Sequence, residues 1–193
     1  SNNILKIMKK IVLAAIAVLG FTFANAQTGG FAKGDTFISG ALNVSSEKTG
    51  DAKSSGFTIE PKVGYFFTEN IAIGAKLGFG SDKVGDDKTN SFTAGAFGRY
   101  YFTPASQFSI YGQAGLDFTN YKHKPGDFKS NEIGANLGLG LSYFLSNHFA
   151  IEATWLGLGY TVNNNGGHGA EKTNSFGFGT DLRDVSFGVV YKF

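Results

Sequence analysis

The chain has 193 residues, no cysteine, and 17 basic against 15 acidic residues. The lack of cysteine excludes a disulfide scaffold, and the near balance of charge excludes an extended basic surface for nucleic acid. Glycine and phenylalanine are abundant, at 28 and 20 residues, whereas proline occurs three times, so the composition favours strands over disorder.

Residues 1–26 have the pattern of a signal peptide. Three lysines precede an apolar run from Ile11 to Phe23, which is too short to cross a bilayer as a helix, and Ala24-Asn25-Ala26 supplies small residues for cleavage. We expect translation to start at Met8 and the exported domain to cover residues 27–193. Without the leader, 14 basic residues face 15 acidic ones, so the positive excess belongs to the leader.

After the leader, apolar and polar residues alternate with period two, which is the pattern of half-buried strands. In one segment Ile71, Ile73 and Leu77 share a face that is opposite to Gly74 and Lys76. The pattern predicts eight strands, at residues 36–44, 56–66, 70–80, 91–102, 107–118, 131–144, 148–160 and 180–193.

The predicted connections alternate in length. Short turns occur at residues 68–70, 103–106 and 145–147, and long polar loops at 45–55, 81–90, 119–130 and 161–179. Short turns at one end and long loops at the other are expected of an up-and-down transmembrane barrel with both termini in the periplasm. With eight strands the first and last can pair, which closes the sheet and removes its edges.

Alternation alone also fits a soluble barrel, such as a secreted lipid carrier with its apolar face inside. Two observations favour the membrane. The polar face is mostly Gly, Ser, Thr and Asn, as a narrow eight-stranded interior requires, and the apolar face carries almost no charge. Aromatic residues also gather at both strand ends, as in two interfacial girdles. Those near the short turns are Tyr65, Tyr100, Phe102, Phe108, Tyr143, Phe149, Tyr191 and Phe193; those near the long loops are Phe57, Phe79, Phe92 and Phe118.

Three segments carry a family resemblance. Phe97-Gly98-Arg99-Tyr100-Tyr101-Phe102 runs into a Thr-Pro turn, and Val63-Gly64-Tyr65-Phe66 is followed by Glu69-Asn70-Ile71-Ala72-Ile73-Gly74. The terminal strand, with Val189, Tyr191 and Phe193 on one face, is similar to the insertion signal of bacterial outer-membrane barrels. The chain thus resembles small Gram-negative outer-membrane β-barrel proteins of the OmpA/OmpX type.

The resemblance implies an all-β, eight-stranded antiparallel barrel in the outer membrane. It also implies insertion by the barrel-assembly machinery and contact with outer-membrane lipid and lipopolysaccharide. It points to no cofactor, and we expect no enzymatic activity.

A polar set on the inward face is the best-defined candidate site. Its members are Glu60, Lys62, Lys76, Arg99, Tyr111 and Glu152. If the hairpin between strands two and three turns about residue 68, Glu60 lies directly opposite Lys76. Arg99 can bind a carboxylate with two hydrogen bonds and can contact Tyr111 across the strand pair. Because unpaired charge is costly in a narrow lumen, we expect a plug; a polar gate for small solutes is the alternative.

The histidines do not form a catalytic or metal site. His123 and His168 lie in different predicted loops, and His148 lies at the opposite end of the barrel. Neither loop histidine has a serine close by in a strand position, as a hydrolase would need, and no second ligand falls at metal spacing. A lipid-modifying barrel enzyme is therefore only a second alternative.

The predicted loop at residues 119–130 is the surface most suited to a partner. Its lysines Lys122, Lys124 and Lys129 could contact lipopolysaccharide phosphates or an external ligand, because lysine binds phosphate as a point charge. An ordinary solvated loop is the plainer interpretation. The sequence therefore predicts a structural or loop-mediated interaction role, with a narrow channel or a lateral route for hydrophobic solutes as the alternative.

Overall fold

The computed structural model describes residues 29–193 except for 50–51, 127, 168 and 179–184. The predicted signal peptide, residues 1–26, and its start at Met8 lie outside the described residues. The strands are β1 (Thr36–Thr49), β2 (Ala52–Phe66), β3 (Ile71–Val84), β4 (Asp87–Tyr101), β5 (Phe108–Lys124), β6 (Phe128–Phe144), β7 (Phe149–Asn163), β8 (Thr173–Phe178) and β9 (Val185–Lys192).

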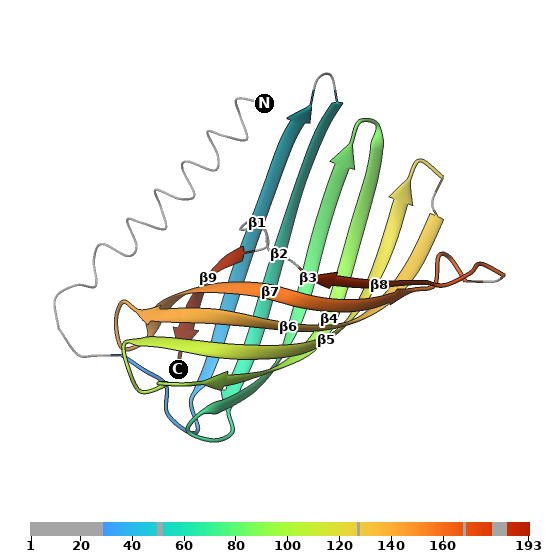
Figure 1. Ribbon diagram of the computed structural model, residues 1–193. Coiled ribbons are helices and arrows are strands. Elements are labelled where there is room, and N and C mark those ends of the chain that lie inside the picture. The colour runs from blue at the N-terminus through green and yellow to red at the C-terminus, as the bar shows by residue number, and fades with distance from the viewer. Residues whose placement is uncertain (1–28, 50–51, 127, 168, 179–184) are drawn as a thin grey trace.

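The strands form one antiparallel sheet that closes into a barrel (Figure 1). Each strand from β1 to β7 pairs with the next one, and β9 pairs with both β7 and β1. The β1–β9 ladder runs from Phe37 opposite Lys192 to Leu42 opposite Phe187, so hydrogen bonding is continuous around the barrel at this level. The predicted eight-stranded barrel is confirmed.

The eighth position of the barrel is shared by β8 and β9. Both pair with β7, β9 along residues 149–155 and β8 along residues 158–163. Sequence alternation predicted one strand at 180–193 and a loop at 161–179, so β8 is a strand that was missed. Between the two levels the β6–β7 register slips at Gly138, where a Cβ atom would meet the carbonyl oxygen of Trp155, and only glycine allows this approach.

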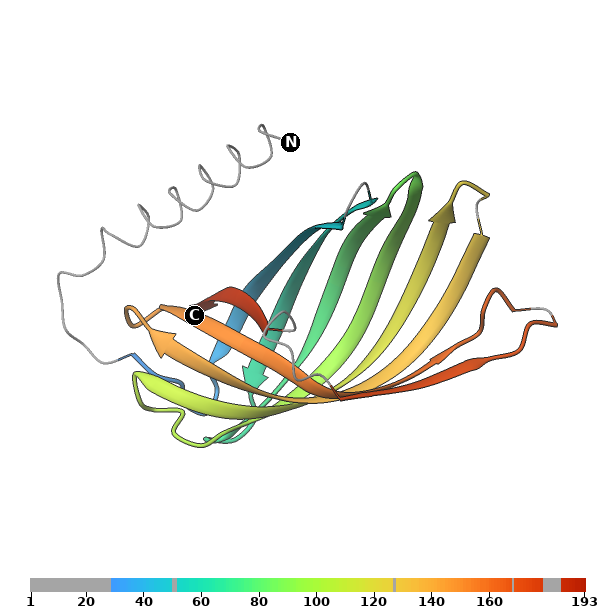
Figure 2. The ribbon, with the colours of Figure 1, turned by 45° about the horizontal axis from the view of Figure 1, so that its top comes forward.

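Three of the predicted long loops are instead continuations of the strands. The β3–β4 ladder extends to Val84 opposite Asp87, so only Gly85 and Asp86 form the turn, with Gly85 at a φ of 60°. The residues of this extension are mostly polar, but their backbones remain paired across the two strands. This pairing satisfies the hydrogen-bonding needs of the backbone N–H and C=O groups. Figure 2 shows the β1–β2, β3–β4 and β5–β6 hairpins rising from one end of the barrel, which we call the hairpin end.

The two faces of the sheet differ as predicted. In β3, Ile73 and Phe79 are about half exposed on the outer face, whereas Ala72 and Lys76 are buried on the inner face. The outer apolar band begins at the end with the short turns, which we call the short-turn end, and on the outer face of β3 its last large apolar residue is Phe79, five residues before the strand ends at Val84. Within the described residues we find no helix that is long and apolar enough to cross a membrane.

Candidate functional site in the barrel lumen

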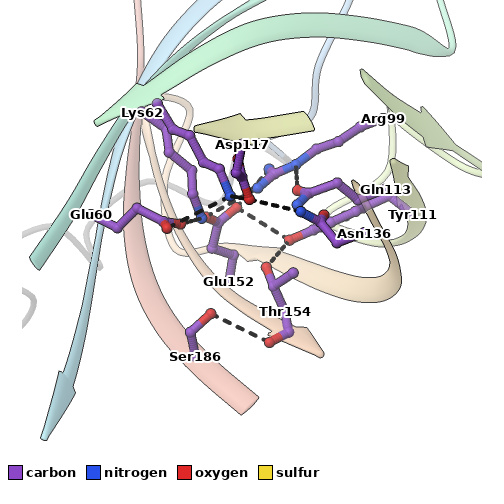
Figure 3. Close-up of polar contacts among 11 residues, drawn as sticks. Glu60, Lys62, Arg99, Tyr111, Gln113, Asp117, Asn136, Glu152, Thr154 and Ser186 are labelled. Carbon is purple, nitrogen blue, oxygen red and sulfur yellow. Dashed lines mark hydrogen bonds and ion pairs between the residues drawn. The ribbon is translucent and has the colours of Figure 1, made fainter. Parts of the chain in front are cut away.

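Arg99 of β4 is at the centre of a buried polar cluster. Its guanidinium donates to the Glu152 carboxylate of β7, over 2.8 Å from Nη1 and 3.4 Å from Nη2, and its Nε donates to Gln113 over 2.7 Å. Nη1 also donates to the Tyr101 hydroxyl over 3.1 Å, and the Tyr111 ring lies 4.3 Å from the guanidinium carbon. Because β5 and β6 separate β4 from β7 in the sheet, this ion pair crosses the lumen (Figure 3).

Glu152 is held from more than one side. The Tyr111 hydroxyl donates to it over 3.4 Å and lies 2.6 Å from the hydroxyl oxygen of Thr154. Arg99 is 1 % exposed and Glu152 3 %. A buried ion pair is tolerated only with such geometry and with further hydrogen bonds on the charged groups.

A second charged cluster lies beside the first, on the walls formed by β2, β3 and β5. The ammonium of Lys62 is 3.0 Å from Glu60, and that of Lys76 is 3.0 Å from Asp117 and 3.7 Å from Glu60. Asn136 of β6 donates to Asp117 over 2.8 Å. Two lysines therefore share two carboxylates, and positive and negative groups alternate across the lumen.

The predicted register of the β2–β3 hairpin is wrong. Lys76 lies opposite Lys62 rather than Glu60, because the turn is centred one residue later than expected. The Thr68 hydroxyl accepts the backbone N–H of Ile71 over 2.9 Å, and this fixes the start of β3. The Glu60–Lys76 ion pair still forms, but on the diagonal.

An aromatic layer fills the lumen at the short-turn end. The Phe31 ring lies 4.5 Å from Phe66, 4.8 Å from Phe144 and 5.3 Å from Tyr101, between ring centroids, and Phe37 also packs against it at 5.5 Å. All five side chains are buried. They come from four strands and from the segment before β1, so they meet in the middle of the barrel.

Phe31 belongs to a segment that crosses the short-turn mouth, residues 29–35, which we call the strap. Its Phe31 N–H donates to the carbonyl oxygen of Pro104 over 2.7 Å. Lys192 of β9 donates from Nζ to the carbonyl oxygen of Gly30 over 2.6 Å and lies 3.5 Å from Asp35. The strap thus ties together turns and strands from around the mouth.

The structure brings the six predicted residues together in the lumen, and it adds others. Gln113 and Asp117 share the inward face with Tyr111 at two-residue spacing, which could have identified them. Phe97 is likewise on the face of Arg99, with its ring centroid 5.1 Å from the guanidinium carbon. Phe31 lies outside any strand, so no periodicity could have placed it.

The comparisons with known proteins agree with the barrel fold. A family model described as "Outer membrane protein beta-barrel domain" matches residues 12–193. The chain belongs to this outer-membrane β-barrel family. No curated protein sequence matches it.

Solved structures of two outer-membrane proteins are similar to this member of the family. OprG from Pseudomonas aeruginosa has 16% identity over 86% of this chain and 99% of its own, with a TM-score of 0.51. Neisserial surface protein A (NspA) has 20% identity over 82% of this chain and 96% of its own, also with a TM-score of 0.51. At these identities the likeness shows the fold, and the family places the chain among outer-membrane barrels.

In this outer-membrane barrel the three predicted contact lysines lie on the β5–β6 hairpin. Lys122 is opposite Lys129, and Lys124 ends β5. On the lumen face of the same hairpin, His123 Nδ1 lies 3.0 Å from the Thr89 hydroxyl oxygen.

Of the other two histidines, only His148 is among the described residues, and it lies at the end of the barrel opposite to His123. His148 contacts the backbone of Lys192 at the short-turn end over 2.9 Å, and His168 lies outside the described residues. No group of three or more His, Cys, Asp or Glu side chains is placed to hold a metal ion in the part of the chain that is described.

The predicted insertion signal lies on the outer face of the last strand. Val189 and Phe193 are 43 % and 63 % exposed, and the Tyr191 ring packs edge-on against Phe193 at 5.1 Å. Their recognition by the assembly machinery stays a prediction.

Proposed function

We propose that this protein is a closed, non-conducting outer-membrane barrel that holds its hairpins at the cell surface, in a structural or interaction role. In this proposal the short-turn end faces the periplasm and the hairpin end faces the medium. The observation that carries it is the Arg99–Glu152 ion pair, which crosses the lumen above the aromatic layer.

The support lies in contacts between strands that are not neighbours. Arg99 of β4 binds Glu152 of β7, Lys76 of β3 binds Asp117 of β5, and the Lys192 ammonium of β9 lies 5.5 Å from the Phe144 ring centroid of β6. Each of these contacts places side chains inside the barrel, in the space through which a solute would pass. An eight-stranded barrel leaves room for little beyond such side chains.

A path for solutes along the lumen could open only if all of these contacts were broken together. The separation of Arg99 from Glu152 would leave a buried charge without its partner, which costs about 3–5 kcal/mol. A narrow channel therefore requires a rearrangement, whereas a plug requires none.

The test is planar-bilayer recording of the folded protein beside an opened variant. We expect no steady conductance from the wild-type barrel. The triple variant F31A/R99A/Y111A removes side chains from both layers, and we expect it to conduct, which shows that the assay can detect an open lumen. Steady wild-type openings as large as those of the variant would contradict the proposal.

The lipid-modifying alternative is tested separately. An enzyme of this kind would need a general base beside a nucleophile near one membrane surface. Among the described residues, His123 beside the Thr89 hydroxyl is the histidine–hydroxyl pair that we test for this role. We expect the H123A variant to leave the lipid species of reconstituted membranes unchanged. A lipid product formed by the wild type and lost in H123A would contradict a non-catalytic role.

A further inference from the structure

A row of inward side chains crosses four strands at the hairpin end. In the backbone register Asp82 of β3 lies opposite Thr89 of β4. Thr89 in turn lies opposite His123 of β5, and His123 lies opposite Phe128 of β6. Thr89 is an even number of positions from the buried Arg99 on the same strand, so alternation directs it inward. Directly opposed residues share a face of the sheet, so the whole row faces the inside of the barrel.

Three aromatic rings follow one another on this inner face. They belong to Tyr121, His123 and Phe128, which we call the ring row. The ring centroids of Tyr121 and His123 are 6.3 Å apart, and those of His123 and Phe128 are 5.8 Å apart. The Phe128 ring lies directly on the backbone of Gly166 in the β7–β8 connection, where a Cβ atom would overlap it, and it is still 51 % exposed. The ring row thus presents an aromatic surface at the mouth of the barrel.

Two carboxylates from strands that are not neighbours act on the Tyr121 hydroxyl. This hydroxyl donates to Glu132 of β6 over 3.3 Å. Tyr121 lies beyond Phe118, the last large apolar residue on the outer face of β5, so it is outside the membrane-spanning part of the strand. Burial, together with Glu132 and with Asp82 of β3, raises the pKa of Tyr121 to about 12. Negative potential from β3 and from β6 therefore converges on the ring row.

The carboxylates of this face have no basic partner among the described residues. Neither Asp82 nor Glu132 forms an ion pair within the described part of the chain. Further into the lumen, Lys76 of β3 is already bound to two other carboxylates. Alternation directs the lysines of the same hairpins to the outer face; these are Lys83, Lys88, Lys122, Lys124 and Lys129. The inner face at the hairpin end therefore has an excess of negative charge.

Aromatic rings beside carboxylates that lack a counter-charge favour one class of ligand. The face of an aromatic ring attracts a cation within about 6 Å of its centroid, and the carboxylates attract the same sign of charge. Both features would repel an anion. A small inorganic cation keeps its hydration shell and gains little from the rings, whereas an alkylated ammonium ion can place its alkyl groups against them.

We propose that the ring row, together with Asp82 and Glu132, binds an organic ammonium ion at the hairpin end. The alkyl groups lie against the rings, and the charged nitrogen faces the carboxylates. This inference goes beyond the proposed closed barrel. The site is on the hairpin side of the charged clusters in the lumen, so it does not depend on whether the lumen conducts.

The experiment compares choline with 3,3-dimethylbutan-1-ol, an uncharged molecule of the same shape. The folded, full-length barrel is titrated with each in maltoside micelles, which contain no choline, at about pH 8, where histidine is ordinarily neutral. NMR follows the labelled aromatic rings. We expect choline to shift the signals of Tyr121, His123 and Phe128, with nuclear Overhauser contacts from its methyl protons to these rings. The uncharged molecule should bind about tenfold more weakly or not at all.

Two variants remove the charge and the ring separately. D82N/E132Q keeps the shape of both side chains and should weaken choline binding about tenfold, and F128L should weaken it about threefold. E69Q and F67L make matching changes at exposed positions of the short-turn end, and they should bind choline as the wild type does. Heat-modifiability on gels verifies that every variant is folded.

Any of four results would overturn the proposal. Equal affinity for the uncharged molecule would mean that the rings bind apolar groups without regard to charge. Unchanged choline binding by D82N/E132Q would place the ligand elsewhere. Complete displacement of choline by sodium at physiological concentration would mean that the carboxylates hold an inorganic cation. Absence of Overhauser contacts to the ring row in the wild type would overturn the proposal without recourse to any variant.

Discussion

At the scale of single residues, Arg99 is the side chain on which the lumen depends most. It combines an ion pair, two hydrogen bonds to neutral side chains and three aromatic rings within 6 Å of its guanidinium carbon. The net contribution of the ion pair to the free energy of unfolding is smaller than the loss measured when Arg99 is truncated, because truncation leaves Glu152 buried without a counter-charge.

A double-mutant cycle should separate these two quantities. We expect R99A and E152A each to lower the free energy of unfolding by about 3–5 kcal/mol, and the double variant to cost less than their sum. Urea unfolding in lipid vesicles, followed through the single tryptophan Trp155, measures this. E69Q, at an exposed turn carboxylate, is the control and should lie within about 0.5 kcal/mol of the wild type. Additive effects would show that Arg99 and Glu152 do not stabilise each other.

The alternation of strand residues assigns these side chains to the inward face of the barrel, but it does not determine their ion-pair and hydrogen-bond partners. Arg99 and Glu152 are 53 positions apart, on strands that are not neighbours, so alternation assigns both to the lumen without bringing them together. The Glu60–Lys76 prediction erred because register depends on the turn, and a shift of one residue in the turn centre moves every opposing pair. Asp117 was on the correct face, but its acidity alone did not show that Lys76 would reach it.

At the scale of elements, the strap determines how the short-turn mouth is closed. It has no regular structure, yet Phe31 is 2 % exposed and packs on four rings. Aromatic pairs of this kind add about 0.5–1.5 kcal/mol each beyond the area that they bury.

Removal of the Phe31 ring should therefore release the strap. We expect F31A to lower the free energy of unfolding by about 3–5 kcal/mol and to expose residues 29–35 to protease in detergent. F67A, at a 61 % exposed turn position of the same end, is the matched control and should change neither property. Unchanged protease resistance in F31A would mean that the strap is held by its backbone and Lys192 alone.

The elements themselves were largely predictable, apart from their outer ends. Apolar alternation located the seven strands β1 to β7 because it persists across the membrane band. Beyond Phe79 and Phe92 the alternation is between polar residues, so it carries no hydropathy signal, and the β3–β4 strands were predicted to stop there. The register that extends them to Val84 and Asp87 comes from backbone pairing, which composition does not report.

At the scale of the whole molecule, the height of the outer apolar band determines the bilayer thickness that suits the barrel. On β2 it runs from Tyr65 to Phe57, which corresponds to roughly 20 Å along the membrane normal for a tilted strand. A typical bilayer core is about 30 Å thick, and outer membranes are thinner than average.

The barrel should therefore be more stable in thin bilayers. We expect a higher free energy of unfolding in dilauroyl- than in dioleoyl-phosphatidylcholine, because mismatch costs a fraction of a kcal/mol per Å, roughly. Urea unfolding in the two vesicles, with boiled and unboiled gel samples to verify folding, measures the difference. Greater stability in the thicker bilayer would mean that the band extends past Phe57.

The contact between Lys192 and Gly30 also has a consequence for the order of assembly. It joins segments 162 positions apart, nearly the full span of the described chain, so it can form only when β9 has reached its place. Until then the strap lacks its contacts with the Lys192 side chain, and the short-turn mouth is not yet closed by them. The docking of the strap by Lys192 is therefore a late step of folding. In a pulse-labelling experiment, the time at which residues 29–35 become protected would report when β9 takes its place in the barrel.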